Sequence, residues 1–295
     1  MSKLASQLFM IVMIGFMAIF FVYTADMPAQ SEVFSALALL TIGLSLGLER
    51  IRPYERRWNQ NRGDLNGDIA SFALIFVVLD GLLKYLAPLL ALALLGGTIT
   101  SPVGLWLREV PLWVEILAVT LLIELAAYLS HWVHHRSRHL WALHAMHHSI
   151  ERLYTLNNFR FHPLNHMINA FAIVMPPLLL GFSEAAIFGY VVLTMPVLVL
   201  QHANVDFQFG WLNRLLNTNE VHRWHHSADS RHGGRNLGRA LTVWDQLFGT
   251  FLDPQSARKT QINLGLGDNN AMRFPDPGRL VAQWRYPFSA ACCQR

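Results

Sequence analysis

The chain has 295 residues, of which 53% are hydrophobic and 14% are charged. Soluble globular domains carry about 25% charged residues, so this composition excludes disordered and fibrous proteins and argues against a soluble enzyme. The formal charge is +4, but the basic residues lie between apolar runs and not in one patch, which argues against a nucleic acid-binding protein.

Four apolar runs in the first half of the chain are predicted to be membrane helices. They cover residues 8–25, 33–48, 69–95 and 112–130. A helix of about 20 apolar residues crosses the core of a bilayer, and these runs approach or exceed that length. The first run resembles the apolar part of a signal peptide, but its length and the second run directly after it favour a retained helix.

Arginines in the connection between the second and third runs predict the orientation of the chain. Arg50, Arg52, Arg56, Arg57 and Arg62 all lie in this segment. Loops rich in arginine and lysine stay in the cytoplasm, so this loop and the N-terminus are predicted to be cytoplasmic. The fourth run then returns the chain to the cytoplasm.

Two further apolar segments, 167–181 and 184–200, are short for full membrane spans and contain Pro176, Pro177 and Pro196. A buried or partly inserted helical hairpin therefore fits these segments as well as two crossings do. Both interpretations return the chain to the cytoplasmic side.

This pattern predicts an all-α integral membrane protein with about four transmembrane helices, a helical hairpin and a histidine-rich cytoplasmic cap. An N-terminal transmembrane region, 1–110, precedes a catalytic region, 111–253, and a C-terminal cytoplasmic tail, 254–295. The tail mixes proline, glycine, asparagine and charged residues, so we expect it to pack loosely. The predicted location is the bacterial inner membrane or an equivalent membrane.

Histidines are confined to one part of the chain, because all 14 lie between His131 and His232. Neutral imidazole is the commonest side-chain ligand for iron, zinc, copper and nickel. A pH-sensing cluster would have no need of a repeated spacing, which this region has. The distribution therefore predicts a metal site on the cytoplasmic side.

The spacing of the histidines favours two metal ions. Residues i, i+3 and i+4 share one helical face, so two rings can bind one ion while the third turns towards a neighbouring site. Eight rings in three boxes are too many for one four-coordinate zinc or for one iron that must also bind oxygen. The boxes are His131 and His135; His144, His147 and His148; and His222, His225 and His226.

With their flanking residues, these boxes resemble the sterol desaturase/fatty acid hydroxylase superfamily of membrane di-iron oxidases. The matching motifs are Y-x-x-H-x-x-x-H-R from Tyr128, L-W-x-x-H-x-x-H-H-S from Leu140, H-R-x-H-H-S from His222, N-x-G from Asn236 and W-D-x-L-F-G-T from Trp244. The spacing of the first box separates this superfamily from acyl-CoA desaturases and alkane hydroxylases. The match extends over about residues 124–251.

The resemblance implies two iron ions and O2-dependent attack on an unactivated C–H bond of a lipid. The reaction would be hydroxylation, which we expect first, or desaturation or ether cleavage. The lipid would be sterol-like, a fatty acyl chain, a carotenoid or an ether lipid. The implied iron ligands are the eight box histidines and His202 in Q-H-A-N, with His162 in F-H-P either as a further ligand or as a residue that supports the ligands from behind. The remaining histidines, His134, His139, His166 and His232, fall outside the motifs.

Carboxylates near the boxes are expected to orient the imidazoles by accepting the second ring N–H. The candidates are Glu124, Asp206 and Asp229. Glu124 is also an ionisable residue in a predicted membrane helix, which marks a candidate functional site. Asn236 is expected to hold the third box. Glu124 and Asn236 are therefore the predicted catalytic residues besides the metal ligands.

Electrons for this chemistry are predicted to come from another protein. The sequence has no haem, flavin or ferredoxin motif, and the adjacent Cys292 and Cys293 can neither hold an iron–sulfur cluster nor cross-link a fold. The predicted donor is a ferredoxin or a b-type cytochrome with its NAD(P)H reductase, docked on the basic cytoplasmic loops.

The alternative function is a non-redox metal-binding membrane protein, either a zinc hydrolase or a metal carrier. A carrier is expected to place polar residues along several spans, and the predicted spans are mostly apolar. A hydrolase is expected to combine an open zinc site with a carboxylate base, and the sequence shows no such motif.

Overall fold

The computed structural model describes residues 1–96, 101–257, 262–267, 274–289 and 292. Over these residues every regular element is a helix, and β-structure is limited to isolated bridges such as that between Pro53 and Val205. The all-α prediction is confirmed for this part of the chain. Cys293 and the rest of the C-terminal end lie outside the described residues.

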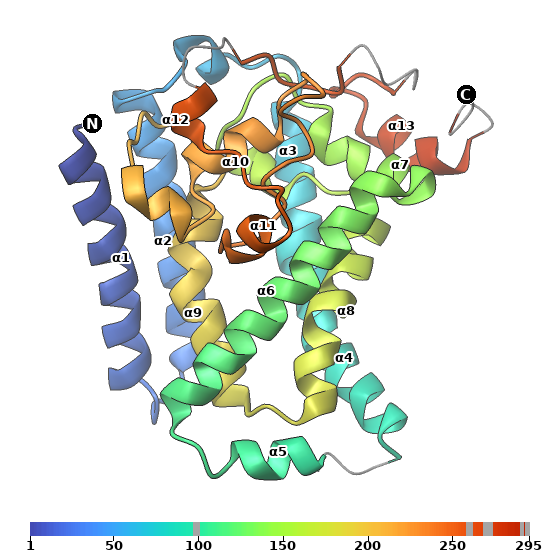
Figure 1. Ribbon diagram of the computed structural model, residues 1–295. Coiled ribbons are helices and arrows are strands. Elements are labelled where there is room, and N and C mark those ends of the chain that lie inside the picture. The colour runs from blue at the N-terminus through green and yellow to red at the C-terminus, as the bar shows by residue number, and fades with distance from the viewer. Residues whose placement is uncertain (97–100, 258–261, 268–273, 290–291, 293–295) are drawn as a thin grey trace.

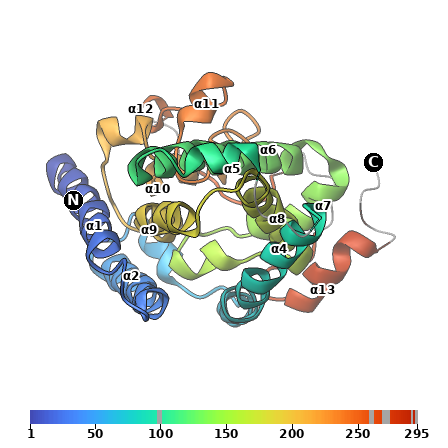
Figure 2. The same ribbon diagram turned by 90° about the horizontal axis from the view of Figure 1, so that it is seen from below.

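Long apolar helices run up and down beside one another (Figures 1 and 2). Within the described part of the chain, five helices are long and apolar enough to cross a membrane, and α9 is apolar but shorter. Lipid-exposed leucine, valine and phenylalanine side chains are expected on such a bundle, and many large apolar side chains are exposed here. The helices are α1 (Lys3–Tyr23), α2 (Gln30–Ile51), the continuous helix Leu65–Leu94, α6 (Leu112–Arg136), α8 (Pro163–Leu180) and α9 (Glu184–Leu200).

The helix Leu65–Leu94 is not uniform. It consists of α3 (Leu65–Phe72), a π-helical segment (Ala73–Leu79) and α4 (Asp80–Leu94). The predicted run began at residue 69, so the observed helix starts four residues earlier. Its first turns pack against the cap and its later turns pack against α8.

The segments 167–181 and 184–200 form two successive helices joined by a tight turn, and of these α8 is long and apolar enough to cross a membrane while α9 is shorter. The prolines Pro176, Pro177 and Pro196 lie within α8 and α9 and do not end them. The turn is made by Gly181, whose φ of 81° is left-handed, and by the Ser183 side chain, which accepts a hydrogen bond from the Ala186 N–H at 3.1 Å. Glu115 of α6 accepts hydrogen bonds from the Ser183 amide and hydroxyl.

Short helices form a cap at one end of the bundle, and α5 (Pro102–Leu107) lies across the other end (Figure 1). All three histidine boxes lie at the cap end, because α6 ends there and α7 and α10 belong to the cap. The cytoplasmic orientation of this end remains a prediction from the arginines. The cap helices are α7 (Arg138–His148), α10 (Asn219–His225), α11 (Val243–Leu247), α12 (Pro254–Ala257) and α13 (Leu280–Arg285).

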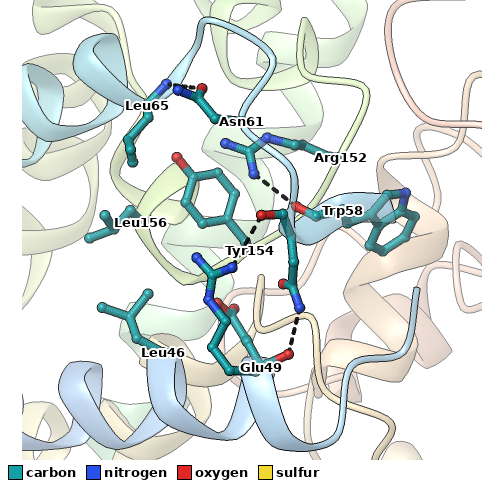
Figure 3. A pocket seen from close by; sticks show the side chains of 10 residues that line it. Leu46, Glu49, Trp58, Asn61, Leu65, Arg152, Tyr154 and Leu156 are labelled. Atoms are coloured by element: carbon teal, nitrogen blue, oxygen red, sulfur yellow. Dashed lines mark hydrogen bonds between the residues drawn. The ribbon is translucent and has the colours of Figure 1, made fainter. Parts of the chain in front are cut away.

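A cavity of about 240 Å³ lies between α2 and the cap (Figure 3). On its wall, the buried Glu49 carboxylate accepts hydrogen bonds from the amide and hydroxyl of Thr155 and from the Asn204 amide. Arg152 donates to both oxygens of Asp64, and its guanidinium lies 4.0 Å from the centre of the Tyr154 ring. These polar groups are paired with one another, so their role here is structural: they hold the bundle and the cap together.

The C-terminal tail is fastened to the cap by buried side chains. The fully buried Arg160 donates to Asp68, to the Pro277 carbonyl and to Gln283. Gln283 is fully buried and donates to the Ser149 hydroxyl at 3.2 Å. The expectation of a loosely packed tail is therefore wrong for residues 274–289.

Candidate metal centre

Nine histidines converge into two adjacent groups at the cap end of the bundle. Within each group, one ligand atom per residue lies within 4.8 Å of all the others. The first group contains His131, His135, His144, His148 and His225, and the second contains His147, His202, His222 and His226. All eight box histidines and His202 are thus brought together.

Each H-x-x-H-H box is divided between the two groups. In α7, His144 and His148 are one turn apart and join the first group, while His147 joins the second. In the box of α10, His225 joins the first group and its two box neighbours join the second. Adjacent helical residues point about 100° apart, so one short helix can supply two sites.

Hydrogen bonds on the outer side of the rings define the tautomers. Five rings place Nδ1 against a carbonyl or amide oxygen, which accepts only, so Nδ1 carries the proton and Nε2 presents a lone pair. The pairs are His131 with the Leu237 carbonyl (2.8 Å), His144 with Asn165 (3.2 Å), His147 with the Arg160 carbonyl (3.2 Å), His202 with Asn157 (2.9 Å) and His225 with the Arg235 carbonyl (2.8 Å).

The tautomer of His202 is fixed by a chain of contacts that starts at the backbone. The Asn157 amide nitrogen donates to the Arg152 carbonyl at 2.6 Å, and its oxygen accepts from the Tyr154 amide at 3.2 Å. The side-chain oxygen must therefore face His202 as an acceptor, and the His202 Nδ1 must donate to it. Asn157 and His202 are both fully buried.

Inside each group, Nε2 atoms approach one another closely. The Nε2 atoms of His131 and His144 are 3.1 Å apart, and those of His202 and His222 are 3.2 Å apart. His131, His144 and His202 each carry their proton on Nδ1, so the 3.1 Å contact brings two lone pairs together without a proton between them. Nitrogens bound at about 2.1 Å to one metal ion, at angles between octahedral and tetrahedral, lie roughly 3.0–3.4 Å apart. The spacing fits nitrogen ligands that share a cation.

Burial keeps the rings outside the membrane helices neutral. It lowers the pKa of His147 to about 3, below the ordinary 6.5. Burial, reinforced by neighbouring imidazoles, lowers the pKa of six other rings of the two groups well below 6.5. Neutral imidazole is the form that binds metal, so these rings are ready to do so near pH 7. The six are His144, His148, His202, His222, His225 and His226.

A buried ring nitrogen without a hydrogen-bond partner also fits a metal ligand. His135 Nε2 is buried and has no hydrogen-bond partner among the described residues. A buried polar atom left unpaired costs free energy. The His135 ring belongs to the five-membered group, where a bound metal would satisfy it. The donor set of each group therefore fits a metal ion.

His162 lies outside both groups. Its Nδ1 accepts a hydrogen bond from the Leu164 amide at 3.1 Å, and its Nε2 donates to the Trp284 carbonyl at 2.9 Å. Both ring nitrogens are thus occupied, and the ring caps the N-terminus of α8. The F-H-P motif here specifies a helix start, since a proline often follows the capping residue.

The predicted catalytic residue Glu124 supports the centre from a distance. This fully buried carboxylate accepts hydrogen bonds from the Ala240 and Leu241 amides at 2.9 and 2.8 Å and from the Tyr190 hydroxyl at 2.8 Å. It holds the loop whose Leu237 carbonyl orients His131. Its contacts are those of an anchor for this loop.

Asn236 has a similar anchoring position. Its side chain donates to the Val221 and Leu252 carbonyls, both at 3.1 Å, and accepts from the Leu252 amide at 2.7 Å. Its φ of 55° is left-handed, a conformation that asparagine tolerates better than most residues. It ties the residue before His222 to the segment after α11.

The expected carboxylate partners of the rings are replaced by carbonyl and amide oxygens. In the described part of the chain, Asp206 pairs with the amino group of Met1 and Asp229 pairs with Arg231. Asn157 and Asn165, which do contact rings, were missed by the sequence analysis. Asn165 lies three residues after His162, but no spacing rule links either asparagine to a box.

A cavity of about 380 Å³ opens beside the two groups. Four of their histidines form part of its wall: His131, His144, His147 and His222. Apolar side chains from several elements form much of the remainder, among them Ile75, Phe159, Ile173, Val174 and Leu198. Phe161 also lines the cavity and stacks on the His147 ring, with centroids 4.4 Å apart. An apolar chain can therefore reach the histidine groups.

The sequence match to known proteins covers this centre. Residues 116–250 match the model of the fatty acid hydroxylase family. This segment is similar to fatty acid hydroxylase domains. It contains all nine histidines of the two groups, and the superfamily resemblance stated from the motifs is confirmed.

Two curated relatives are lipid-modifying enzymes. The chain is 28% identical to the ornithine lipid hydroxylase OlsE of Rhizobium tropici over 93% of this chain and 81% of that protein. It is 27% identical to the alkylglycerol monooxygenase of Danio rerio over 47% of this chain and 30% of that protein. No solved structure matches the chain.

Proposed function

We propose that this protein is a membrane-bound di-iron oxidoreductase that uses O2 to hydroxylate a C–H bond of a lipid. The observation that carries the proposal is the convergence of two imidazole groups beside a partly apolar cavity within a bundle of membrane-length helices. The lipid hydroxylase and monooxygenase relatives support the reaction class.

The composition of the first group favours iron over zinc. Structural zinc sites take four ligands, whereas the first group offers five imidazoles. Iron accepts five or six ligands and remains bound to imidazole when its oxidation state changes. Bound at both groups, iron would supply the redox chemistry that activates O2 towards an unactivated C–H bond.

The residues of the chain hold, orient and shield the reacting groups. Carbonyl and amide oxygens fix the imidazole rings from behind, so the ligand atoms are positioned before metal binds. Phe161 stacks on the His147 ring and lines the cavity together with Phe159, and these apolar side chains are expected to exclude water from it. Ile173 and Val174 provide an apolar wall for the chain of a lipid.

An external electron donor follows from the stoichiometry of hydroxylation. Insertion of one oxygen atom into a C–H bond leaves the second atom of O2 to become water, which requires two electrons and two protons. We propose a ferredoxin or a b-type cytochrome with its NAD(P)H reductase as the donor. The exposed arginines of the 50–62 loop, on the cap side, are a suitable docking surface for an acidic protein.

The same loop supports an orientation in which the histidine centre faces the cytoplasm. We propose the bacterial inner membrane, or an equivalent membrane, as the location. For the substrate, the ornithine lipid named for the Rhizobium relative is the first candidate, because that match extends over 93% of this chain. Ether cleavage is the second reaction to test, given the alkylglycerol monooxygenase match.

The test combines metal analysis with turnover. Detergent-purified protein is expected to contain about two irons per chain and to consume O2 when supplied with lipid, reductant and an electron-transfer protein. The His147→Ala variant is expected to lose iron and turnover, whereas His139→Ala, at an exposed histidine outside both groups, retains them. Zinc alone in protein expressed with ample iron, or no O2 uptake by the iron-loaded protein with any lipid, would contradict the proposal.

A further inference from the structure

The cavity wall formed by α8 changes from polar to apolar along the helix. His166, Asn169, Ala170, Ile173 and Val174 line the cavity and form one stripe with helical spacing. The first two are polar and lie in the first turns of the helix, on the cap side, while the last two are apolar and lie deeper in the bundle. The cavity thus offers a polar end and an apolar end to a ligand.

The polar end is the end next to the histidine groups. Asn165, in the first turn of α8, contacts His144, and Asn169 accepts a hydrogen bond at 2.6 Å from Ser130, the residue before His131. His166 lies against Phe161, which in turn stacks on His147. A lipid whose polar part fills the polar end therefore presents that part to the metal centre.

An acidic residue stands at this polar end. Asp80 begins α4 directly after the π-helical segment, and π-helical segments recur at functional sites. Its Oδ1 lies 2.7 Å from the His166 Nε2, and its side chain is 47% exposed. An ionisable side chain within a membrane-length helix is costly and marks a functional site.

A fixed positive charge lies on the same cavity wall. Arg239 lines the cavity, and its Nη1 donates to the Tyr190 hydroxyl at 2.6 Å. Tyr190 in turn donates to Glu124, so the guanidinium is held within a buried network. The cavity therefore carries a carboxylate and a guanidinium, a pattern that complements a ligand with both a cationic and an anionic group.

We propose that the cavity binds the zwitterionic headgroup of an acylated amino-acid lipid. Its ammonium group pairs with Asp80 beside His166, its carboxylate pairs with Arg239, and its acyl chains follow the apolar stripe. This proposal rests on the proposed lipid hydroxylation and deepens it. It also assigns the reacting C–H bond to the polar part of the lipid, since that part lies next to the histidine groups.

The experiment uses two lipids that differ by one charge. An ornithine lipid carries a free side-chain ammonium, and the same lipid with this amine acetylated does not. The iron-loaded protein is expected to have a KM at least about tenfold lower for the free amine, as expected for one charge-assisted contact. Product analysis is expected to locate the new hydroxyl in the amino-acid part.

Variants assign this preference to Asp80. Asp80→Asn is expected to raise the KM for the free-amine lipid about tenfold and to leave the KM for the acetylated lipid unchanged. Asp80→Glu retains the preference, because it retains the carboxylate. Asp26→Asn makes the same chemical change at an exposed loop residue between α1 and α2 and leaves both KM values unchanged. Equal effects of Asp80→Asn on both lipids would show an ordinary helix–helix contact and overturn the proposal.

Failure of this proposal is distinguishable from failure of the proposed function. Equal turnover of both lipids by the wild-type protein overturns the headgroup proposal and leaves lipid hydroxylation intact. If the protein hydroxylates no lipid, retention of each lipid by the purified protein, measured by native mass spectrometry, still tests the charge preference. Equal retention of the free-amine and acetylated lipids then overturns the headgroup proposal as well.

Discussion

The two histidine groups lie side by side but are built differently. The first has five rings, all from the three sequence boxes, on α6, α7 and α10. The second has four rings, and one of them, His202, comes from the connection after α9. Its His147 ring is oriented by the Arg160 carbonyl, and the Arg160 side chain holds the C-terminal tail. The second group therefore depends on more distant parts of the chain. It has four ligands, so the loss of one leaves only three.

The largest effect is expected at His202. The His202→Ala variant leaves three imidazoles in the second group, and we expect iron to fall from about two to about one per chain. Turnover is expected to fall by more than the roughly 100-fold that loss of a ring's hydrogen-bond partner can cost. Elemental analysis and O2 uptake of the purified variant measure both quantities.

Loss of His135 is expected to have a smaller effect. The His135→Ala variant leaves four imidazoles in the first group. Among the described residues, His135 Nε2 has no hydrogen-bond partner, so the substitution breaks no hydrogen bond at this atom. We expect two irons per chain and about a tenfold loss of turnover. If this variant loses as much iron as His202→Ala, the proposed difference between the groups is wrong.

Two asparagines that orient ligand rings allow the two histidine groups to be compared without removing a ligand. Asn157→Ala removes the oxygen that orients His202, and Asn165→Ala removes the oxygen that orients His144. Losses of 10–100-fold in metal affinity are typical for such partners. We expect the larger loss for Asn157→Ala, in iron titration of the metal-free protein, because its group has four ligands. A larger loss for Asn165→Ala would contradict this order.

The smallest effect is expected at the tail. Gln283→Ala removes the hydrogen bonds of Gln283 to Arg160 and Ser149. Leaving buried polar groups unpaired costs about 1–3 kcal/mol, so thermal unfolding should begin at a lower temperature. Iron content is expected to remain near two per chain, because the Arg160 carbonyl keeps its contact with His147. Loss of both irons in a folded variant would show that the tail is part of the metal centre.

The helical spacing of the histidines in the sequence predicted where the centre lies. The three boxes gave eight of the nine gathered histidines, and the i, i+3, i+4 pattern anticipated that one box can serve two sites. His202 was predicted as an extra ligand and His162 as a ligand or a supporting residue, each as a single histidine in a short motif. They differ because Pro163 starts a helix after His162, and both nitrogens of that ring then serve as cap and donor.

The partners of the rings could not be predicted in the same way. Carboxylates were expected to orient the rings, but the backbone carbonyls of Leu237, Arg160 and Arg235 accept these hydrogen bonds. Every residue has a backbone carbonyl, so the residue type at these positions gives no indication of the contact. Apolar runs predicted the bundle, since hydropathy reports lipid exposure. They did not reveal the firm attachment of the tail, which depends on the buried contacts of Arg160 and Gln283.

X-ray absorption at the iron edge of the purified wild-type protein and of His202→Ala tests the central claim most directly. For the wild type, the account predicts about two irons per chain, surrounded by nitrogen ligands at roughly 2.0–2.2 Å with the scattering pattern of imidazole rings. For His202→Ala it predicts about half the iron, with the remaining ions still ligated by imidazole. Iron bound by oxygen or sulfur ligands, or an unchanged iron content and spectrum in the variant, would contradict a centre built from these two histidine groups.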